Sequence, residues 1–378
     1  MHIAMRKVYM SILTIMLVTV TMFATTYAWV GILTYSHISE FDLNLKTQDL
    51  ESDYFLSISA SGEENTFSDI ANSSVIKEQI LLNMGKDLSI IPYDKQSDTD
   101  MYYQVIDELF DKSNDLYPVT TSKTGMLNNE FYGMDNKKFN SITNEKTTHF
   151  FRFDLYLSIE AKKEEMLTDD VNAQIDIILP FIEETLQGSR RSIRLGNNFE
   201  YPLDNLYALD IPSNKISNDQ IITVNSASAT RLAIAVYDPI LRGESYQGTE
   251  QPSKLVIYQG GTKTPTYDAT TDTYSFGGIL PEEYNLALVE HKKKYNLGTD
   301  KLNVPTEMIN RGDLELIEEN KVLVDGTNGF GIVNGKKTVL KLTVFFWFEG
   351  WDSDCFEVIN NQNVNINLTL STGEIRNV

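Results

Sequence analysis

Residues 331–348 read Gly331-Ile-Val-Asn-Gly-Lys-Lys-Thr-Val-Leu-Lys-Leu-Thr-Val-Phe-Phe-Trp-Phe348, and no other segment carries so clear a structural signal. Asn334-Gly335 lies between two apolar runs, and both residues tolerate the positive φ of a type I′ turn, so a β-hairpin is predicted. The second arm, 340–348, is apolar on both faces, which is typical of a central strand that is covered on both sides. We predict that one face of this strand lies in the core: Leu342, Val344, Phe346 and Phe348.

Alternation of apolar and polar residues with a period of two recurs along the chain. An apolar face opposite a polar face is typical of antiparallel sheets with one face in water. This pattern predicts six further strands: 41–45, 56–60, 151–159, 171–179, 232–236 and 364–370. Because a single sheet would leave its apolar face exposed, so many strands favour two packed sheets. We expect a mainly β fold, an antiparallel β-sandwich of jelly-roll-like type.

Helical periodicity is confined to insertions between the predicted strands. Two helices are expected near 68–111, because residues 68–86 and 98–111 carry apolar side chains at helical spacing. A third is expected over 281–297. It begins with Pro281 and two glutamates and ends with a run of lysines, which are typical start and stop signals.

The N-terminal residues predict where the protein goes. Arg6 and Lys7 precede an uncharged run, 8–33, which exceeds the length of about 20 residues that a hydrophobic helix needs to span a bilayer. A basic start followed by an apolar run is also the design of a secretory signal peptide. Small residues two positions apart end at Ala28, which predicts signal-peptidase cleavage after this residue.

Two interpretations of residues 1–28 follow. The favoured one is a signal peptide that is removed, and the other is a retained anchor that crosses the membrane once. Under either, the positive-inside rule places Arg6 and Lys7 in the cytoplasm and the domain 29–378 outside it. The expected localisation is therefore extracellular or at the cell surface, secreted or anchored by the N-terminal segment.

The composition excludes several classes of partner. The 378 residues include 32 Lys and Arg against 53 Asp and Glu, so the net charge is −21. Such an acid excess argues against nucleic acid and against anionic lipid surfaces, because both require clustered basic residues. Cys355 is the only cysteine, which excludes an intrachain disulfide. Neighbouring carboxylates disfavour its thiolate, so we expect a buried structural cysteine.

Known catalytic motifs are absent from the sequence. None of the four histidines (His2, His37, His149 and His291) belongs to the H-E-x-x-H motif of zinc proteases, and there is no G-x-S-x-G motif. The glycines of 331–335 are separated by three residues, whereas a phosphate loop has four. We therefore assign no catalytic and no cofactor-binding residue, and a protein that is not an enzyme is favoured.

Three pairs of acidic residues lie in turn-like segments, where a hard cation such as Ca²⁺ finds oxygen ligands. They are Asp98/Asp100, Asp268/Asp272 and Asp352/Asp354. With 53 acidic residues such pairs arise by chance, so a solvated surface is the favoured interpretation. The candidate metal pair is Asp352 and Asp354, because it directly follows the predicted central strand.

Two segments carry a family resemblance. Ala24-Thr-Thr-Tyr-Ala-Trp29 resembles the end of the signal peptides of TasA/camelysin-like surface proteins of Gram-positive bacteria, which a SipW-type signal peptidase processes. Ala28 and Trp29 match the cleavage alanine and the aromatic residue that follows it. Trp347-Phe-Glu-Gly-Trp-Asp-Ser-Asp-Cys355 is similar to a near-terminal strand and turn in larger proteins with such signals. The resemblance implies a matrix or fibre protein, or a camelysin-type metalloprotease.

The favoured function is that of a non-enzymatic structural protein of the cell surface or extracellular matrix. Cleavage after Ala28 would release an apolar, β-prone segment with Trp29, Val30, Ile32 and Leu33, and TasA-like subunits donate such a segment to the sheet of a neighbouring copy. Self-association by such strand donation is one interpretation of these residues. The others are the outer end of a retained membrane anchor and an ordinary strand in their own sheet. The alternatives are a surface hydrolase or metalloprotease of camelysin type, and an adhesin, glycan-binding module or virion surface protein.

Overall fold

The chain is described by a computed structural model. The model describes residues 36–48, 54–112, 115–116, 118–128, 130–133, 138–140, 150–163, 170–178, 186–187, 190–194, 221–225, 229–259, 266–268, 273–275, 315–316, 321–350, 352, 355 and 362–377. The segments 1–28 and 29–33 and the predicted helix 281–297 lie outside this set. Within it, no helix is both long and apolar enough to cross a membrane.

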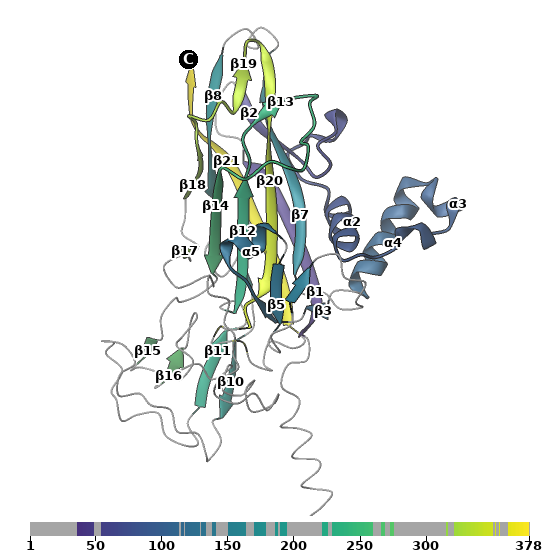
Figure 1. Cartoon of the computed structure of the whole chain (residues 1–378), viewed down its shortest axis with the longest axis vertical. Helices are drawn as coiled ribbons and strands as arrows, with labels where there is room; N and C mark the ends of the chain where they lie inside the picture. Colours follow the sequence, from purple (N-terminus) through teal and green to yellow (C-terminus); the bar gives the residue numbers. More distant parts are fainter. Residues whose placement is uncertain are drawn as a thin grey trace, which may run out of the picture.

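The predicted hairpin is confirmed. Strand β19 (Gly331–Val333) turns through Asn334, with φ of 51°, and Gly335, with φ of 70°, into the long strand β20 (Lys336–Phe348). Positive φ at both turn residues is the geometry of a type I′ turn. Strand β20 is central, because it pairs antiparallel with β7 on one edge and with β12 on the other (Figure 1).

In the described part of the chain, fourteen strands form one continuous sheet. One group of strands surrounds β20: β2 (Tyr54–Ser59), β7 (Phe151–Ala161), β12 (Thr230–Val236), β13 (Ile240–Leu241), β14 (Lys254–Gln259) and β17 (Glu315–Leu316). A second group joins it through β19: β1 (Ser36–Gln48), β3 (Asp115–Leu116), β8 (Val171–Ile178), β9 (Leu186–Gln187), β18 (Lys321–Asp325) and β21 (Gln362–Asn377). The fold is thus mainly β, with mostly antiparallel pairing, as predicted.

Smaller elements accompany the main sheet. One separate sheet contains β4 (Val119–Thr120), β5 (Glu130–Gly133) and β6 (Lys138–Asn140), with α5 (Lys123–Leu127) between β4 and β5. Another contains β10 (Arg190–Arg194), β11 (Ile221–Asn225), β15 (Thr266–Asp268) and β16 (Thr273–Ser275).

The pairing of β1 departs from the antiparallel expectation. β1 and β21 run parallel over ten residue pairs, from Ile38 opposite Gln362 to Gln48 opposite Ser371. Antiparallel neighbours are commonly joined by short hairpins, whereas strands from opposite ends of a chain have no such constraint on their direction. The N-terminal strand is therefore held by backbone hydrogen bonds to the last strand and not by a local turn.

The prediction that one face of β12 is exposed to solvent is also wrong. All seven residues of β12 are buried, because two separate apolar clusters cover its two faces. Leu232 and Ile234 join the main core, to which both groups of strands contribute, whereas Ala233 and Ala235 join a second cluster. This second cluster lies beneath β4, β5 and α5 and is built on aromatic residues: Phe131, Phe150, Phe345 and Trp347.

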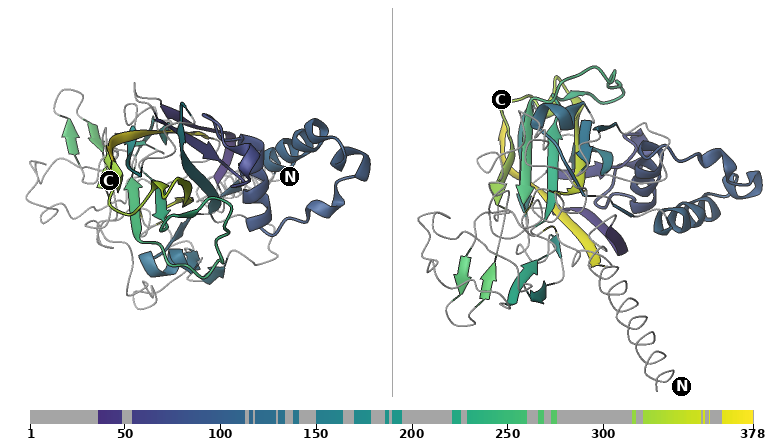
Figure 2. Two further views of the ribbon diagram at one scale, coloured as in Figure 1. Left: turned by 90° about the horizontal axis from the view of Figure 1, so that it is seen from above. Right: turned by 60° about the horizontal axis from the view of Figure 1, so that its bottom comes forward.

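Two predicted helices are present with shorter bounds. α2 (Ser73–Asn83) lies inside the predicted 68–86, and α4 (Thr99–Asp111) begins after the N-cap Asp98. Between or before them lie η1 (Glu64–Thr66), η2 (Leu88–Ile90) and α3 (Tyr93–Gln96). Figure 1 and Figure 2 show that α2, α3 and α4 form one helical arm, in which α2 lies beside β7 and α3 and α4 extend away from the strands.

Helix α2 also closes an edge of the sheet. β2 pairs with only part of the edge of β7. Where β2 ends, two side-chain amides of α2 form hydrogen bonds with the backbone of β7 that a neighbouring strand would otherwise form. Gln79 Oε1 accepts from the Asp154 amide at 2.8 Å, and Gln79 Nε2 donates to the Asp154 carbonyl at 3.1 Å. Asn83 Nδ2 donates to the Arg152 carbonyl at 2.7 Å. These bonds satisfy backbone groups that would otherwise invite pairing with another chain.

We predict that Phe346→Ala strongly destabilises the protein. Phe346 is fully buried, and its ring lies 6.1 Å from that of Phe151 and 5.9 Å from that of Phe348. Truncating a buried phenylalanine costs about 3–5 kcal/mol of unfolding free energy. Denaturant unfolding measures the loss. Leu82→Ala, at a side chain that is 54% exposed, is the control and should cost less than about 0.5 kcal/mol. Similar losses in both variants would contradict the assigned position of β20.

Candidate functional site

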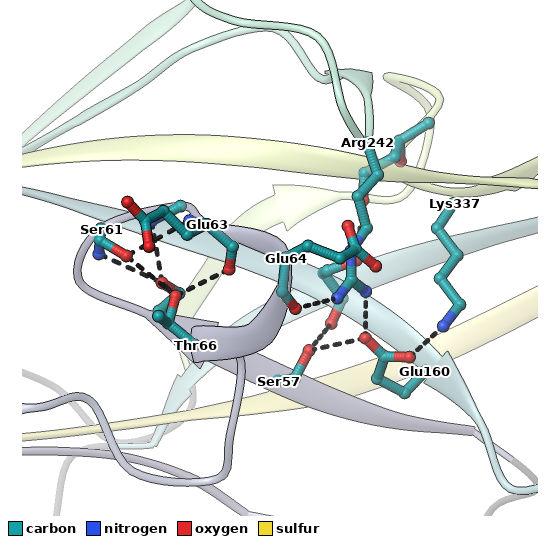
Figure 3. Close-up of polar contacts among 12 residues, drawn as sticks. Ser57, Ser61, Glu63, Glu64, Thr66, Glu160, Arg242 and Lys337 are labelled. Carbon is teal, nitrogen blue, oxygen red and sulfur yellow. Dashed lines mark hydrogen bonds and ion pairs between the residues drawn. The ribbon is translucent and has the colours of Figure 1, made fainter.

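The first candidate site is a cluster of charges on the outer face of β7 and β20. In the antiparallel register of β7 and β20, Ser158 lies opposite Val339. Two residues farther along β7, the same register places Glu160 opposite Lys337. Arg242, which directly follows β13, reaches the same carboxylate from the other side, so Glu160 forms ion pairs with both cations (Figure 3). Glu64 of η1 forms a further ion pair with Arg242, with 2.7 Å between Oε2 and Nε.

The two cations keep the Glu160 carboxylate ionised. Burial by itself raises the pKa of Glu160, but hydrogen bonds from Lys337 and Arg242 and their positive charges outweigh this effect and lower the pKa below its ordinary value. The side chain of Glu160 is 16% exposed. A carboxylate that is held ionised and saturated with donors is poorly suited to act as a general acid.

Arg242 also fixes the loop that contains η1. Its Nη2 donates to the Glu64 carbonyl at 3.0 Å, and its guanidinium carbon lies 4.5 Å from the centre of the Phe67 ring. Within the loop, the Thr66 hydroxyl lies 2.9 Å from the hydroxyl of Ser61 (Figure 3). The cluster therefore joins four segments that are distant in sequence: η1, β7, the end of β13 and β20.

A second polar cluster lies farther along the same face. Lys341 Nζ lies 2.9 Å from Asp154 Oδ2, and the Thr343 hydroxyl donates to Asp154 Oδ1 at 2.6 Å. The same ammonium lies 5.1 Å from the ring centre of Tyr237 and 5.8 Å from that of Tyr246, within cation–π range. The Lys341 side chain is only 12% exposed, so these rings shield it from water.

Two tyrosines near Asp154 and Lys341, Tyr156 and Tyr246, are held in their neutral form. Burial, followed by the negative charge of Asp154, raises the pKa of Tyr156 to about 12. Burial likewise raises the pKa of Tyr246, whose hydroxyl donates to the Val339 carbonyl at 3.1 Å and accepts from the Lys341 amide at 3.0 Å. These contacts stabilise β20 and keep Tyr156 and Tyr246 un-ionised at neutral pH.

The third cluster is fully buried at the end of β20. Arg231 Nη2 lies 2.5 Å from Asp352 Oδ2, and both side chains are 0% exposed. Arg231 Nη1 also donates to the Thr230 carbonyl at 2.9 Å, and Trp347 Nε1 donates to Glu349 Oε2 at 3.1 Å. Buried charges need such partners, because desolvation otherwise costs several kcal/mol.

This third cluster bears on the candidate metal pair. Asp352 is not a solvated surface residue, because it is completely buried and forms an ion pair with Arg231. Asp354 lies outside the described residues. Cys355 is 1% exposed, which confirms the prediction of a buried cysteine. In the described part of the chain, no three or more His, Cys, Asp or Glu side chains come together as metal ligands.

The remaining site residues predicted from the sequence belong to the N-terminal segment. Ala28, Trp29, Val30, Ile32 and Leu33 lie outside the described residues. Of the histidines, His37 lies in β1, opposite Asp115 of β3, and the other three are outside the described set. The alternating pattern placed Glu160 and Arg231 on the polar sides of their predicted strands. No sequence pattern predicted that Glu160 would bind Arg242 or that Arg231 would bind Asp352.

Comparison with known proteins adds no relatives. No protein-family model matches the chain, and neither a curated protein nor a solved structure gives a significant match.

We predict that Glu160→Gln destabilises the protein at neutral pH by about 1–3 kcal/mol, because two partly buried cations lose their hydrogen-bonded carboxylate. Since folding lowers the pKa of Glu160, its charge stabilises the protein above the ordinary pKa of 4.5. This contribution is lost as the pH falls through the lower pKa of the folded state. The difference between wild type and variant should therefore shrink in acid.

Denaturant unfolding at pH 7 and at stepwise lower pH measures this difference. The matched control is Glu64→Gln, which removes the other carboxylate bound to Arg242. The side chain of Glu64 is 72% exposed, so its loss should cost only about 0–1 kcal/mol. Equal losses for both variants, or a Glu160→Gln difference that does not change with pH, would contradict the assigned cluster.

A further prediction concerns the buried ion pair. Asp352→Asn leaves the buried guanidinium of Arg231 without its countercharge and should cost about 3–5 kcal/mol. The double variant Arg231→Met/Asp352→Leu removes both charges and should recover most of this loss. Thermal unfolding of wild type and of Asp352→Asn, each with and without added Ca²⁺, distinguishes a structural ion pair from a metal ligand. A stabilisation by Ca²⁺ that Asp352→Asn abolishes would show a metal ligand and refute the structural role.

Proposed function

We propose that the chain is a non-enzymatic structural protein of the cell surface or extracellular matrix. In this proposal residues 1–28 are a signal peptide or a membrane anchor, and residues 29–378 form the extracellular domain. The proposal includes a β-sandwich of jelly-roll-like type for this domain. Support for two packed sheets comes from the main core, to which both groups of strands contribute buried side chains, such as Leu342 of β20 and Leu368 of β21.

The observation that carries the structural role is the parallel pairing of β1 with β21. β1 and its partner β21 come from opposite ends of the described chain, and no hairpin links the two strands. A strand held in this way makes the same backbone hydrogen bonds whether its own chain or a neighbouring copy supplies it. The apolar segment with Trp29, Val30, Ile32 and Leu33 lies two residues before β1 in the sequence and would lengthen an exchanged strand.

The resemblance to TasA/camelysin-like proteins supports the same conclusion. It rests on the segment from Ala24 to Trp29, whose counterpart in that family precedes the mature fibre subunit. The polar clusters are consistent with a scaffold, because the carboxylates of Asp154, Glu160 and Asp352 each bind a cation from another strand or loop. Their contacts join distant segments of the chain, which is the arrangement expected of residues that stabilise a fold and not of residues that act in catalysis.

We predict that the protein beginning at Trp29 assembles into oligomers or fibres, whereas the protein beginning at Ser36 stays monomeric at equal concentration. The longer form carries the apolar segment that can add a strand to a neighbouring copy. Gel filtration and electron microscopy distinguish the two outcomes. Ile32→Asp in the longer form is the control, because a charge within an apolar donated strand should block assembly. If both forms stay monomeric, or both assemble alike, strand donation is refuted.

A further inference from the structure

The helical arm, residues 70–112, has a buried root. Its inner side chains belong to the main core of the protein: Ile76, Ile80, Leu81, Ile106 and Phe110. Polar contacts join its helices, since Lys77 Nζ lies 3.0 Å from Asp107 Oδ1 and the Tyr102 hydroxyl donates to Glu78 Oε1 at 2.6 Å. The arm is therefore anchored on the sheet and projects outward from it (Figure 1, Figure 2).

The outer end of the arm, residues 87–101, is here called the arm tip. It exposes three large apolar side chains, Ile90 at 68%, Tyr93 at 83% and Met101 at 49%. Throughout the described residues, every exposed large apolar side chain lies between residues 70 and 101, on this arm. Scattered apolar residues are normal on a surface, but their concentration on one projecting element is typical of an interaction site.

The backbone of the arm tip is held in place before any partner binds. Asp87 caps η2 by accepting from the Ser89 amide at 2.9 Å, and Asp98 caps α4 by accepting from the Met101 amide at 3.1 Å. Gln96 Nε2 donates to the Ile91 carbonyl at 2.6 Å. A fixed backbone lowers the entropy that binding must overcome, so these exposed side chains are arranged in advance.

The charges of the arm tip select the partner. Residues 87–101 contain four aspartates, Asp87, Asp94, Asp98 and Asp100, and one lysine, Lys95, so their net charge is 1 − 4 = −3. All four aspartates are exposed. This field repels anionic lipid. It also disfavours a second copy of a chain whose net charge is −21.

We infer that the arm tip is a docking site for a basic polypeptide surface that also presents apolar residues. Ile90, Tyr93 and Met101 supply the apolar anchors at the centre of the contact. The exposed Asp94 and Asp100 are the sequence neighbours of Tyr93 and Met101 and pair with lysine or arginine of the partner. Central apolar anchors within a charged rim are the usual anatomy of a protein interface. This site is independent of strand donation and gives the proposed surface protein a second partner.

The test uses the full chain in phosphatidylcholine nanodiscs and a fluorescent amphipathic peptide of leucine and lysine. The matched peptide carries glutamate in place of lysine and should not bind. Ile90→Ser/Tyr93→Ser should weaken binding of the basic peptide about tenfold or more. The control Ile70→Ser/Leu82→Ser removes two other exposed apolar side chains, at 55% and 54%, from the same arm but outside the tip. It should change the dissociation constant less than about twofold.

The charge contribution has its own matched pair of variants. Asp94→Asn/Asp100→Asn should weaken binding about threefold to tenfold and reduce its dependence on salt. Asp238→Asn/Glu244→Gln removes the same formal charge from exposed residues near β13 and should have less than about a twofold effect. If both pairs of charge variants act alike, the peptide responds only to net charge and the docking site is refuted.

A membrane-inserting tip is the competing outcome. Cys355 is buried, so a Tyr93→Cys variant can be labelled at the arm tip with an environment-sensitive fluorophore. The basic peptide should shift its emission to shorter wavelength, and added phosphatidylcholine vesicles should not. A shift with vesicles alone would overturn the inference, as would equal loss of peptide binding in the tip variant and in its control.

Discussion

The burial of β20 on both faces is the constraint on which the rest of the structure depends. Its even-numbered residues from Leu342 to Phe348 lie in the main core, whereas Phe345 and Trp347 lie in the second cluster. One strand can serve two apolar clusters only if elements cover it from both sides. That requirement explains why β4, β5 and α5 pack over the face opposite the main core. The buried backbone of β20 also needs hydrogen-bond partners, which β7 and β12 supply on its two edges.

Charged residues on this scaffold are tolerated because each finds a partner from a distant segment. Glu160 is bound by Arg242 and Lys337, Asp154 by Lys341, and the fully buried Asp352 by Arg231. Such pairs contribute little net stability when desolvation is counted, but an unpaired charge at the same place is costly. These ion pairs therefore act mainly against alternative strand registers, in which the same buried charges would lose their partners, and add little to the stability of the native register.

The helical arm shows how a β scaffold can carry a separate binding element. Its root contributes Ile76 and Phe110 to the core, and the amides of Gln79 and Asn83 close the open edge of β7. With the root fixed in this way, the tip can expose Ile90 and Tyr93 without loss of the fold. Protection of a sheet edge and presentation of a binding surface are thus two results of the same insertion.

The sequence by itself determined the local elements: the Asn334-Gly335 hairpin, the alternating strands, and α4 with its cap at Asp98. These follow from φ preferences, periodicity and capping, which depend on neighbouring residues. Only the tertiary structure decided the parallel partner of β1, the cover over both faces of β12, and the buried pair of Arg231 with Asp352. Each of these joins segments about eighty or more residues apart in sequence, and no short-range preference specifies such contacts. Burial and charge pairing within the assembled core select them.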